Sequence, residues 1–188
     1  MTPDLSSYRV LIVPGLHNSG PEHWQTRWQH LYPAFERVEQ DDWEHPDLPT
    51  WSQRLQQQLQ QSHRPTIIIA HSFGCLTTLH AAGRFSHVAA ALLVAPADPQ
   101  KFGVAAELSN ARLQCPSVVI GSADDPWMAS HRASHWADIW RSGFINAGAL
   151  GHINAESGLG DWPDGMRQLT SLLEVASLAT QSRNAVFS

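Results

Sequence analysis

The segment Ala70–Gly74, which reads Ala-His-Ser-Phe-Gly, places a serine between an apolar run and a helical pattern. A chain that turns sharply from strand to helix exposes the hydroxyl of a serine at the turn, as in a nucleophile elbow. Such a crowded turn needs small residues two before and two after the serine, and here Ala70 stands where glycine is usual. The alternative is an ordinary serine that caps a helix. The segment therefore predicts a relaxed nucleophile elbow, with Ser72 as the attacking group.

A serine hydroxyl needs a base, and the base needs an acid that holds its tautomer. Behind a nucleophile elbow, the acid and then the histidine follow the serine along the chain. Asp124 and Asp125 come directly after the apolar run Ser117–Ile120. His152 follows a weaker strand pattern that ends near Asn146. Taken singly, the aspartates fit a turn and the histidine fits a surface loop. Their order predicts a triad with His152 as the base and either aspartate as its partner.

An acyl transfer also needs two backbone N–H groups that face the negative charge developing on the carbonyl oxygen. The residue after the nucleophile supplies one of them, which is Phe73 here. The loop Pro14–Gly20 follows the first apolar run, and we predict that Leu16 supplies the other. Gly15 would let the backbone turn inward at that point. An ordinary connector is one alternative, and a phosphate loop is a weak one because no Gly-Lys-Ser/Thr ending follows.

These groups need a scaffold, and continuous apolar runs typical of strands buried on both faces supply it. Four such runs are Val10–Val13, Thr66–Ala70, Val88–Val94 and Ser117–Ile120. Two weaker strand patterns are Glu36–Gln40 and Gly143–Asn146. Helical periodicity covers Glu22–Leu31, Trp51–Gln61 with Thr50 as N-cap, Ser72–Gly83, Ala129–Trp140 and Met166–Leu178.

Strand and helix alternate along the chain, which predicts an α/β fold: a doubly wound, mostly parallel sheet of about six strands. A single domain over residues 1–178 and a flexible tail over 179–188 are expected. The gap between Ala95 and Ser117 is about 20 residues, and it must also hold a helix. Since that leaves no room for a cap domain, we predict an open cleft at the carboxyl edge of the sheet.

Composition excludes several classes of function. The 188-residue chain has 43% hydrophobic and 15% charged residues, which is enough to bury a core. Its net charge of -5 and its lack of a Lys/Arg run argue against nucleic acid as a partner. No signal peptide or membrane-length apolar run is present, so a cytoplasmic protein without a membrane partner is expected. Cys75 and Cys115 form no metal-ligand pair, and His131 and His135 lack a carboxylate partner. We therefore predict neither metal nor cofactor.

The chain has eight tryptophans, a high number for its length. Four of them stand at helical spacing and are expected in the core: Trp24, Trp28, Trp136 and Trp140. The other four lie on or near loops expected at the active edge, and we predict that they line a substrate pocket: Trp43, Trp51, Trp127 and Trp162.

Taken together, these segments resemble the small single-domain serine hydrolases of the α/β-hydrolase fold that include retinoblastoma-binding protein 9 and its bacterial relatives. The resemblance runs from about residue 8 to about residue 175. It rests on Val13–Gly15, Ala70–Gly74, Ser122–Pro126, Gly151–Asn154, Ser157-Gly158 and Trp162-Pro163.

The resemblance implies a triad of Ser72, Asp125 and His152, and it favours Asp125 over its neighbour. Retinoblastoma binding is attributed to a Leu-x-Cys-x-Glu segment in that family. The nearest match here, Leu113–Ser117, ends in serine instead of glutamate and runs into a predicted buried strand. No such protein partner is therefore expected.

The expected reaction is hydrolysis of a small carboxylic ester through an acyl-enzyme, with a small amide as the alternative bond. The expected partner is thus a small-molecule acyl substrate. One rival hypothesis is a non-catalytic α/β module that binds a ligand or protein through the same edge, although such a module has no need of the three triad residues together. A second rival keeps the triad and uses peroxide in place of water.

Overall fold

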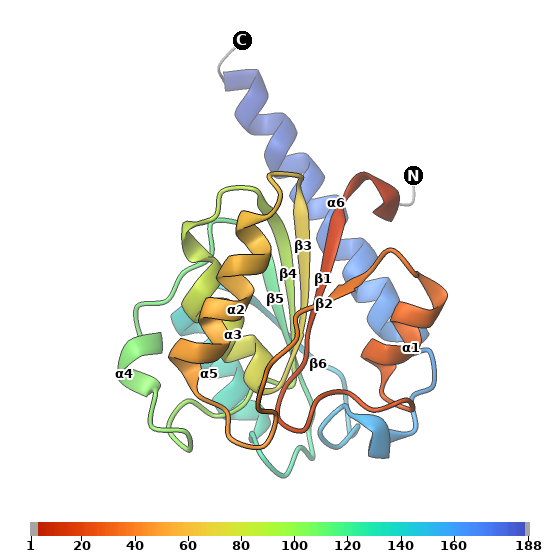
Figure 1. Cartoon of the computed structure of the whole chain (residues 1–188), viewed down its shortest axis with the longest axis vertical. Helices are drawn as coiled ribbons and strands as arrows, with labels where there is room; N and C mark the ends of the chain where they lie inside the picture. Colours follow the sequence, from red (N-terminus) through yellow and green to blue (C-terminus); the bar gives the residue numbers. More distant parts are fainter. Residues whose placement is uncertain (1–3, 187–188) are drawn as a thin grey trace.

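Six parallel strands form one sheet in the order β2-β1-β3-β4-β5-β6, as seen in the computed structural model, which describes residues 4–186 (Figure 1). The strands are β1 (Arg9–Val13), β2 (Glu36–Arg37), β3 (Thr66–His71), β4 (Val88–Val94), β5 (Ser117–Gly121) and β6 (Gly143–Asn146). The predicted α/β fold is confirmed, and the sheet is parallel throughout.

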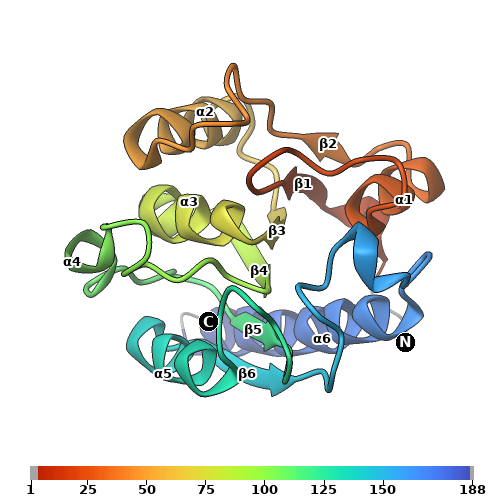
Figure 2. The ribbon, with the colours of Figure 1, turned by 90° about the horizontal axis from the view of Figure 1, so that it is seen from below.

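Helices cover both faces of the sheet (Figure 2), so the inner strands β1 and β3 bury every side chain, whereas the edge strands β2 and β6 keep exposed positions. The α-helices are α1 (Trp24–Leu31), α2 (Leu48–Gln60), α3 (Phe73–Ala81), α4 (Ala105–Leu108), α5 (Ser130–Trp140) and α6 (Pro163–Val186). Short 3-10 helices are η1 (Leu5–Ser7), η2 (Ala82–Arg84) and η3 (Ala155–Ser157). Helices α1 and α6 lie on one face, and α2, α3 and α5 lie on the other.

The alternation of side chains along the strands divides the core into two halves. Ile68 of β3 packs in the half that α2, α3 and α5 cover, whereas Ile67 and Ile69 pack in the half under α1 and α6. All three side chains are fully buried. At about 1.5–3 kcal/mol for each large apolar side chain buried, these three positions together contribute about 5–9 kcal/mol toward folding.

Some element boundaries differ from the prediction. Helix α2 begins at Leu48, because the Asp47 carboxylate accepts a hydrogen bond from the N–H of Thr50 and caps the helix in place of the predicted Thr50. Strand β2 keeps only two residues of the predicted five, since it lies at the edge of the sheet and pairs with β1 alone. Helix α6 continues to Val186, past the predicted helix end at Leu178. The last two residues of the predicted tail, 187–188, lie outside the described residues.

The strand ends set the place of the site. Register pairs Val13 with Ala70, His71 with Val94, and Gly121 with Asn146. The loops after β1, β3, β5 and β6 therefore leave from one edge of the sheet, where α/β folds carry their sites.

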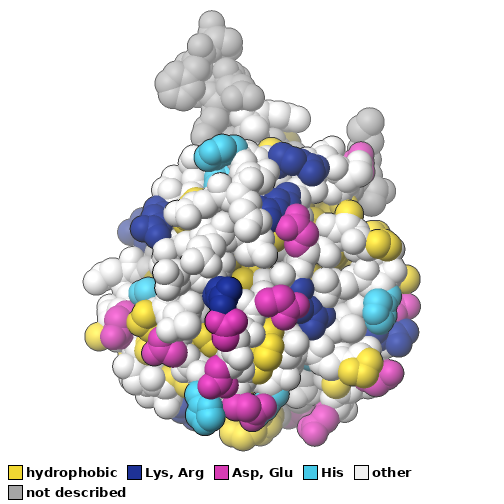
Figure 3. Space-filling view, in the orientation of Figure 1, with side chains coloured by type: hydrophobic (Ala, Val, Ile, Leu, Met, Phe, Trp, Pro, Cys, Tyr) yellow, Lys and Arg dark blue, Asp and Glu magenta, His cyan; other side chains and the backbone are white. Residues whose placement is uncertain are grey.

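The connection from β4 to β5 contains only the four-residue helix α4, so no cap domain covers the carboxyl edge. Among residues 4–186, no helix combines the length and the apolar character that a membrane crossing requires. On the face shown in Figure 3, acidic and basic side chains are interspersed without a continuous patch of either sign.

Candidate active site

Ser72 lies on a strained turn between β3 and α3. Its φ of 54° and ψ of -121° are unusual for a residue with a side chain, and the surrounding structure holds this conformation. Its N–H donates to Val94 O at 3.0 Å, and its own carbonyl accepts from Ala97 N at 3.1 Å. Gly74 follows in the first turn of α3, where an added Cβ would lie 2.2 Å from Val13 O. This geometry is that of a nucleophile elbow.

The loop after β1 lies directly against this turn. A Cβ added at Gly15 would lie 2.8 Å from Ser72 Cβ and 3.1 Å from Phe73 N. Leu16 follows Gly15 and lines the same cavity as Ser72. Phe73 is the first residue of α3, where backbone N–H groups have no partner within the helix. Both residues of the predicted oxyanion hole therefore flank Ser72, and the role of their N–H groups stays a prediction.

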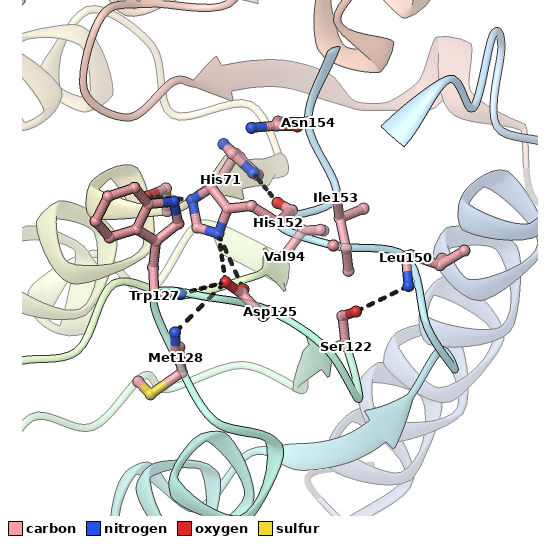
Figure 4. Close-up of polar contacts among 12 residues, drawn as sticks. His71, Val94, Ser122, Asp125, Trp127, Met128, Leu150, His152, Ile153 and Asn154 are labelled. Atoms are coloured by element: carbon pink, nitrogen blue, oxygen red, sulfur yellow. Dashed lines mark hydrogen bonds and ion pairs between the residues drawn. The ribbon is translucent and has the colours of Figure 1, made fainter. Parts of the chain in front are cut away.

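Ser72, His152 and Asp125 form a hydrogen-bonded chain. Figure 4 shows its link between His152 and Asp125. A carboxylate only accepts hydrogen bonds, so Nδ1 of His152 carries a proton and donates it to Asp125 Oδ2 at 2.9 Å. Nε2 of His152 is then free to accept from Ser72 Oγ at 3.0 Å. The side chain of His152 is 12% exposed and that of Asp125 is 1% exposed. Of the three residues predicted as a triad, His152 is thus within hydrogen-bond reach of both Ser72 and Asp125.

Backbone N–H groups hold the acid in place. Asp125 Oδ1 accepts from Trp127 N at 2.9 Å and lies 3.4 Å from Met128 N. These two backbone donors therefore keep the carboxylate oriented toward His152. Such preorganisation lets an acid fix the tautomer of a histidine.

Asp124 does a different task from its neighbour. Its Oδ1 accepts from Gly151 N at 2.8 Å and from Ser122 Oγ at 2.9 Å. These hydrogen bonds, that of Gly151 first, hold the pKa of the Asp124 carboxyl below its usual value. Ser122 Oγ in turn accepts from Leu150 N at 2.9 Å. Asp124 and Ser122 therefore tie the loop after β5 to the loop that carries His152. The sequence left open which aspartate pairs with His152, and in the structure it is Asp125 that contacts its ring.

A cavity of about 440 Å³ opens onto Ser72 and His152. Trp127, with 61% of its surface exposed, and Phe102, with 40% exposed, line its wall. Lys101 also lines the cavity, and its Nζ donates to the carbonyl of Trp127 at 2.6 Å. Sequence reasoning missed Phe102 and Lys101, because they lie in a connection without periodicity.

Of the four tryptophans predicted to line a pocket, only Trp127 does so. Trp51 is 2% exposed and packs its ring against Phe73 in the core. Trp43 packs edge-on against Trp51 and adds to the same half of the core. Trp162 is 4% exposed and stacks on Trp28 in the other half. The pocket prediction is wrong for these three residues, since their rings fill the core instead.

Two further histidines line the cavity: His71, the last residue of β3, and His23, which precedes α1. They are 5% and 4% exposed. The His-Ser pair in the elbow segment was the only sequence signal for His71, and nothing in the sequence marked His23. The described residues contain no group of three or more side chains that could hold a metal ion.

Comparison with known families matches residues 10–171 to a family described as serine hydrolase. A putative YdeN-like hydrolase from Pectobacterium atrosepticum is 35% identical, with a TM-score of 0.86 over 91% of this chain and 93% of the other. The ydeN gene product of Bacillus subtilis is 19% identical, with a TM-score of 0.71 over 89% and 99% of the two chains. A putative hydrolase of the α/β superfamily from Xanthomonas campestris is 15% identical, with a TM-score of 0.67 over 88% and 96%. The search of curated proteins finds no match.

Proposed function

Because this chain belongs to the serine hydrolase family, we propose that it hydrolyses small carboxylic esters through an acyl-enzyme on Ser72. The observation that carries the proposal is the hydrogen-bonded chain from Ser72 Oγ through His152 to Asp125. A non-catalytic binding module has no need of this arrangement on a strained elbow. The narrower kinship with the retinoblastoma-binding protein 9 group remains part of this proposal.

The reaction begins when His152 Nε2 takes the proton of Ser72 Oγ as the oxygen attacks the ester carbonyl. Asp125 stabilises the imidazolium that forms, and the N–H groups of Leu16 and Phe73 donate to the tetrahedral oxyanion. The C–O bond to the alcohol then breaks, and His152 returns its proton to the leaving oxygen. Water attacks the acyl-enzyme with His152 again as base, which releases the carboxylic acid and restores Ser72.

The walls of the cavity favour an apolar acyl group. Phe102 and Trp127 present aromatic surface beside Ser72, and Phe102 packs its ring edge-on against Phe73 at 5.0 Å between centroids. Asp98, which also lines the cavity, is neutralised by Arg132 at 2.7 Å. With no cap over the carboxyl edge, the site admits a small or flexible substrate without closure of a lid. The proposed partner is therefore a small uncharged ester.

A fluorophosphonate probe tests the nucleophile. We expect one adduct on Ser72, located by mass spectrometry, and no adduct in Ser72→Ala. The matched control is Ser86→Ala, an exposed serine on another part of the surface, which should label like the wild type. A well-folded wild-type protein that stays unlabelled would contradict the proposal and favour the binding module.

A series of p-nitrophenyl esters from acetate to octanoate tests the acyl group. Each methylene that reaches the aromatic wall should raise kcat/KM about fourfold, from about 0.8 kcal/mol per buried CH2. Trp127→Ala should flatten this rise, while Leu31→Ala, which removes an exposed leucine on α1, should leave it unchanged. A rise of equal slope in Trp127→Ala would contradict the assignment of this wall. Hydrogen peroxide in the same assay separates ester hydrolysis from perhydrolysis.

A further inference from the structure

The residue before the nucleophile contacts the backbone of the base. His71 ends β3, and its Nε2 lies 2.9 Å from the carbonyl oxygen of His152 (Figure 4). A carbonyl oxygen only accepts hydrogen bonds, so Nε2 of His71 carries the proton and donates it. The two rings meet edge to face, with 4.9 Å between their centroids. Ser72 and His152 are therefore joined twice, once through their side chains and once through His71.

Hydrogen bonds from other parts of the fold hold the loop that carries His152. Ile153 has a φ of 49°, a left-handed conformation that is rare for a β-branched residue. Trp24 Nε1 donates to the carbonyl of Ile153 at 2.8 Å, and Asp124 accepts from the N–H of Gly151. With His71, three successive residues of this loop each have a backbone group tied to a different part of the fold. Of these three hydrogen bonds, only that of His71 reaches the main chain of His152 itself.

His23 also packs against His71. Their rings meet edge to face at 4.7 Å between centroids, and Trp24 lies against both. Nδ1 of His23 accepts from Gln25 N at 3.1 Å, so the proton of the neutral ring lies on Nε2. That Nε2 has no hydrogen-bond partner among the described residues. Packing against His23 thus leaves His71 little space to rotate away from His152.

Both supporting histidines are held uncharged. Burial first, and then coulombic coupling to the His23 and His152 rings, keeps the pKa of His71 well below its usual value. Burial, with Arg37 and His152, lowers the pKa of His23 to about 3. A second cation beside His152 would oppose the imidazolium that forms when it takes the proton of Ser72. A neutral donor holds the base without this penalty.

We propose that His71 is a positioning residue: its Nε2–H fixes the backbone of His152, and so keeps the base aligned with Ser72. This inference rests on the proposed function, since it concerns how the same base is held. His71 packs against the ring of His152 but has no hydrogen bond to its ring nitrogens or to Ser72 Oγ, so it takes no part in the proton transfer. Its loss should therefore lower kcat much more than it changes KM, because Phe102 and Trp127, which form the wall proposed for the acyl group, stay in place.

Two variants separate the hydrogen bond from the packing. His71→Phe keeps a ring and removes the donor, whereas the amide nitrogen of His71→Gln can stand near the place of Nε2. We expect His71→Phe to lower kcat and the fluorophosphonate labelling rate by about 10- to 100-fold, as for a base displaced by a fraction of an ångström. His71→Gln should recover most of that loss. The control His131→Phe, at an exposed histidine of α5, should change neither quantity.

A loss in His71→Phe of less than twofold, or an equal loss in both variants, would overturn the proposal. NMR of histidines labelled with ¹³C and ¹⁵N at pH 7 gives a readout that needs no substrate. His71 should show a neutral ring protonated on Nε2, and the carbonyl carbon of His152 should shift in His71→Phe. A His71 protonated on Nδ1 would overturn the inference even in an active enzyme. If the wild type fails to label while His71 shows the expected tautomer, the proposed function fails and the contact stands.

Discussion

The lowered pKa of His23 leads us to expect that the folded protein loses stability in mild acid. The pKa of this buried side chain is lowered from 6.5 to about 3 by burial, and then by Arg37 and His152. The folded state therefore keeps His23 neutral at pH values where the unfolded chain binds a proton. Stability rises with pH wherever the unfolded state holds more protons. The free energy of unfolding therefore keeps the full contribution of neutral His23 above about pH 6.5. It loses that contribution gradually as the pH falls from 6.5 toward 3.

The size of the effect follows from the pH interval. At pH 5, an unfolded histidine with a pKa of 6.5 favours unfolding by about 2 kcal/mol relative to pH 7.5. We therefore expect the free energy of unfolding to fall by at least this amount between pH 7.5 and pH 5, with His71 adding a further share of the same sign. In urea, 2 kcal/mol corresponds to a midpoint shift of roughly 1 M.

The assay is urea unfolding followed by tryptophan fluorescence at both pH values. His23→Asn is the informative variant, because asparagine can still accept from Gln25 N at the start of α1 but cannot titrate. The change in unfolding free energy between the two pH values should be about 2 kcal/mol smaller in His23→Asn than in the wild type. His131→Asn, at an exposed histidine, is the control. An equal pH dependence in His23→Asn and wild type would refute the reasoning.

Two pairs of matched substitutions test the roles of Asp125 and Gly74, with Asp124 and Gly20 as their controls. Asp125→Asn should lower kcat/KM by about 10⁴-fold, since the acid no longer holds the tautomer of His152, whereas Asp124→Asn should cost far less because it loosens only the loop. Ester hydrolysis by both variants checks this, and equal losses would contradict the division of roles. Gly74→Ala should destabilise the protein by about 3 kcal/mol or more, since the new Cβ would meet Val13 O at 2.2 Å. Gly20→Ala, which meets nothing within 4 Å, should unfold like the wild type in thermal denaturation.

The central strands were predictable because the sheet is covered on both faces. A strand such as β4, which pairs with β3 and β5, must be apolar on both sides, and its bounds Val88–Val94 match the apolar run. The edge strand β2 has one neighbour and polar residues, so its sequence says little about where pairing ends. Sequence resolves the strands best where packing constrains every side chain.

That Ser72, the aspartates and His152 lie together was predictable from their order and from the parallel sheet, because loops after parallel strands meet at one edge. The choice between Asp124 and Asp125 was not, since adjacent residues share that edge. It depends on which carboxylate accepts the hydrogen bonds that the N–H groups of Trp127 and Met128 donate. Only coordinates, or a resemblance to a family, supply that detail.

The error on Trp51 has a plain physical origin. Trp51, Leu55 and Leu59 share one face of α2, and that spacing predicts burial. The pocket assignment instead gave weight to the nearness of Trp51 to a loop. In the structure all three side chains are buried, with exposures of 2%, 0% and 0%. Helical periodicity is therefore the stronger signal where it conflicts with position along the chain.

The relaxed elbow motif shows that its two small positions are not equivalent. Ala70 lies within β3, between β1 and β4, and its methyl group packs in the core with no exposed surface. Gly74 lies in α3 against β1, where any Cβ would lie 2.2 Å from Val13 O and 2.6 Å from Pro14 O. At position 70 only the size of the side chain is limited, since a residue of this buried strand points its side chain into the core. The second position excludes every side chain because backbone carbonyls occupy the space, so alanine is tolerated before the serine and glycine is required after it.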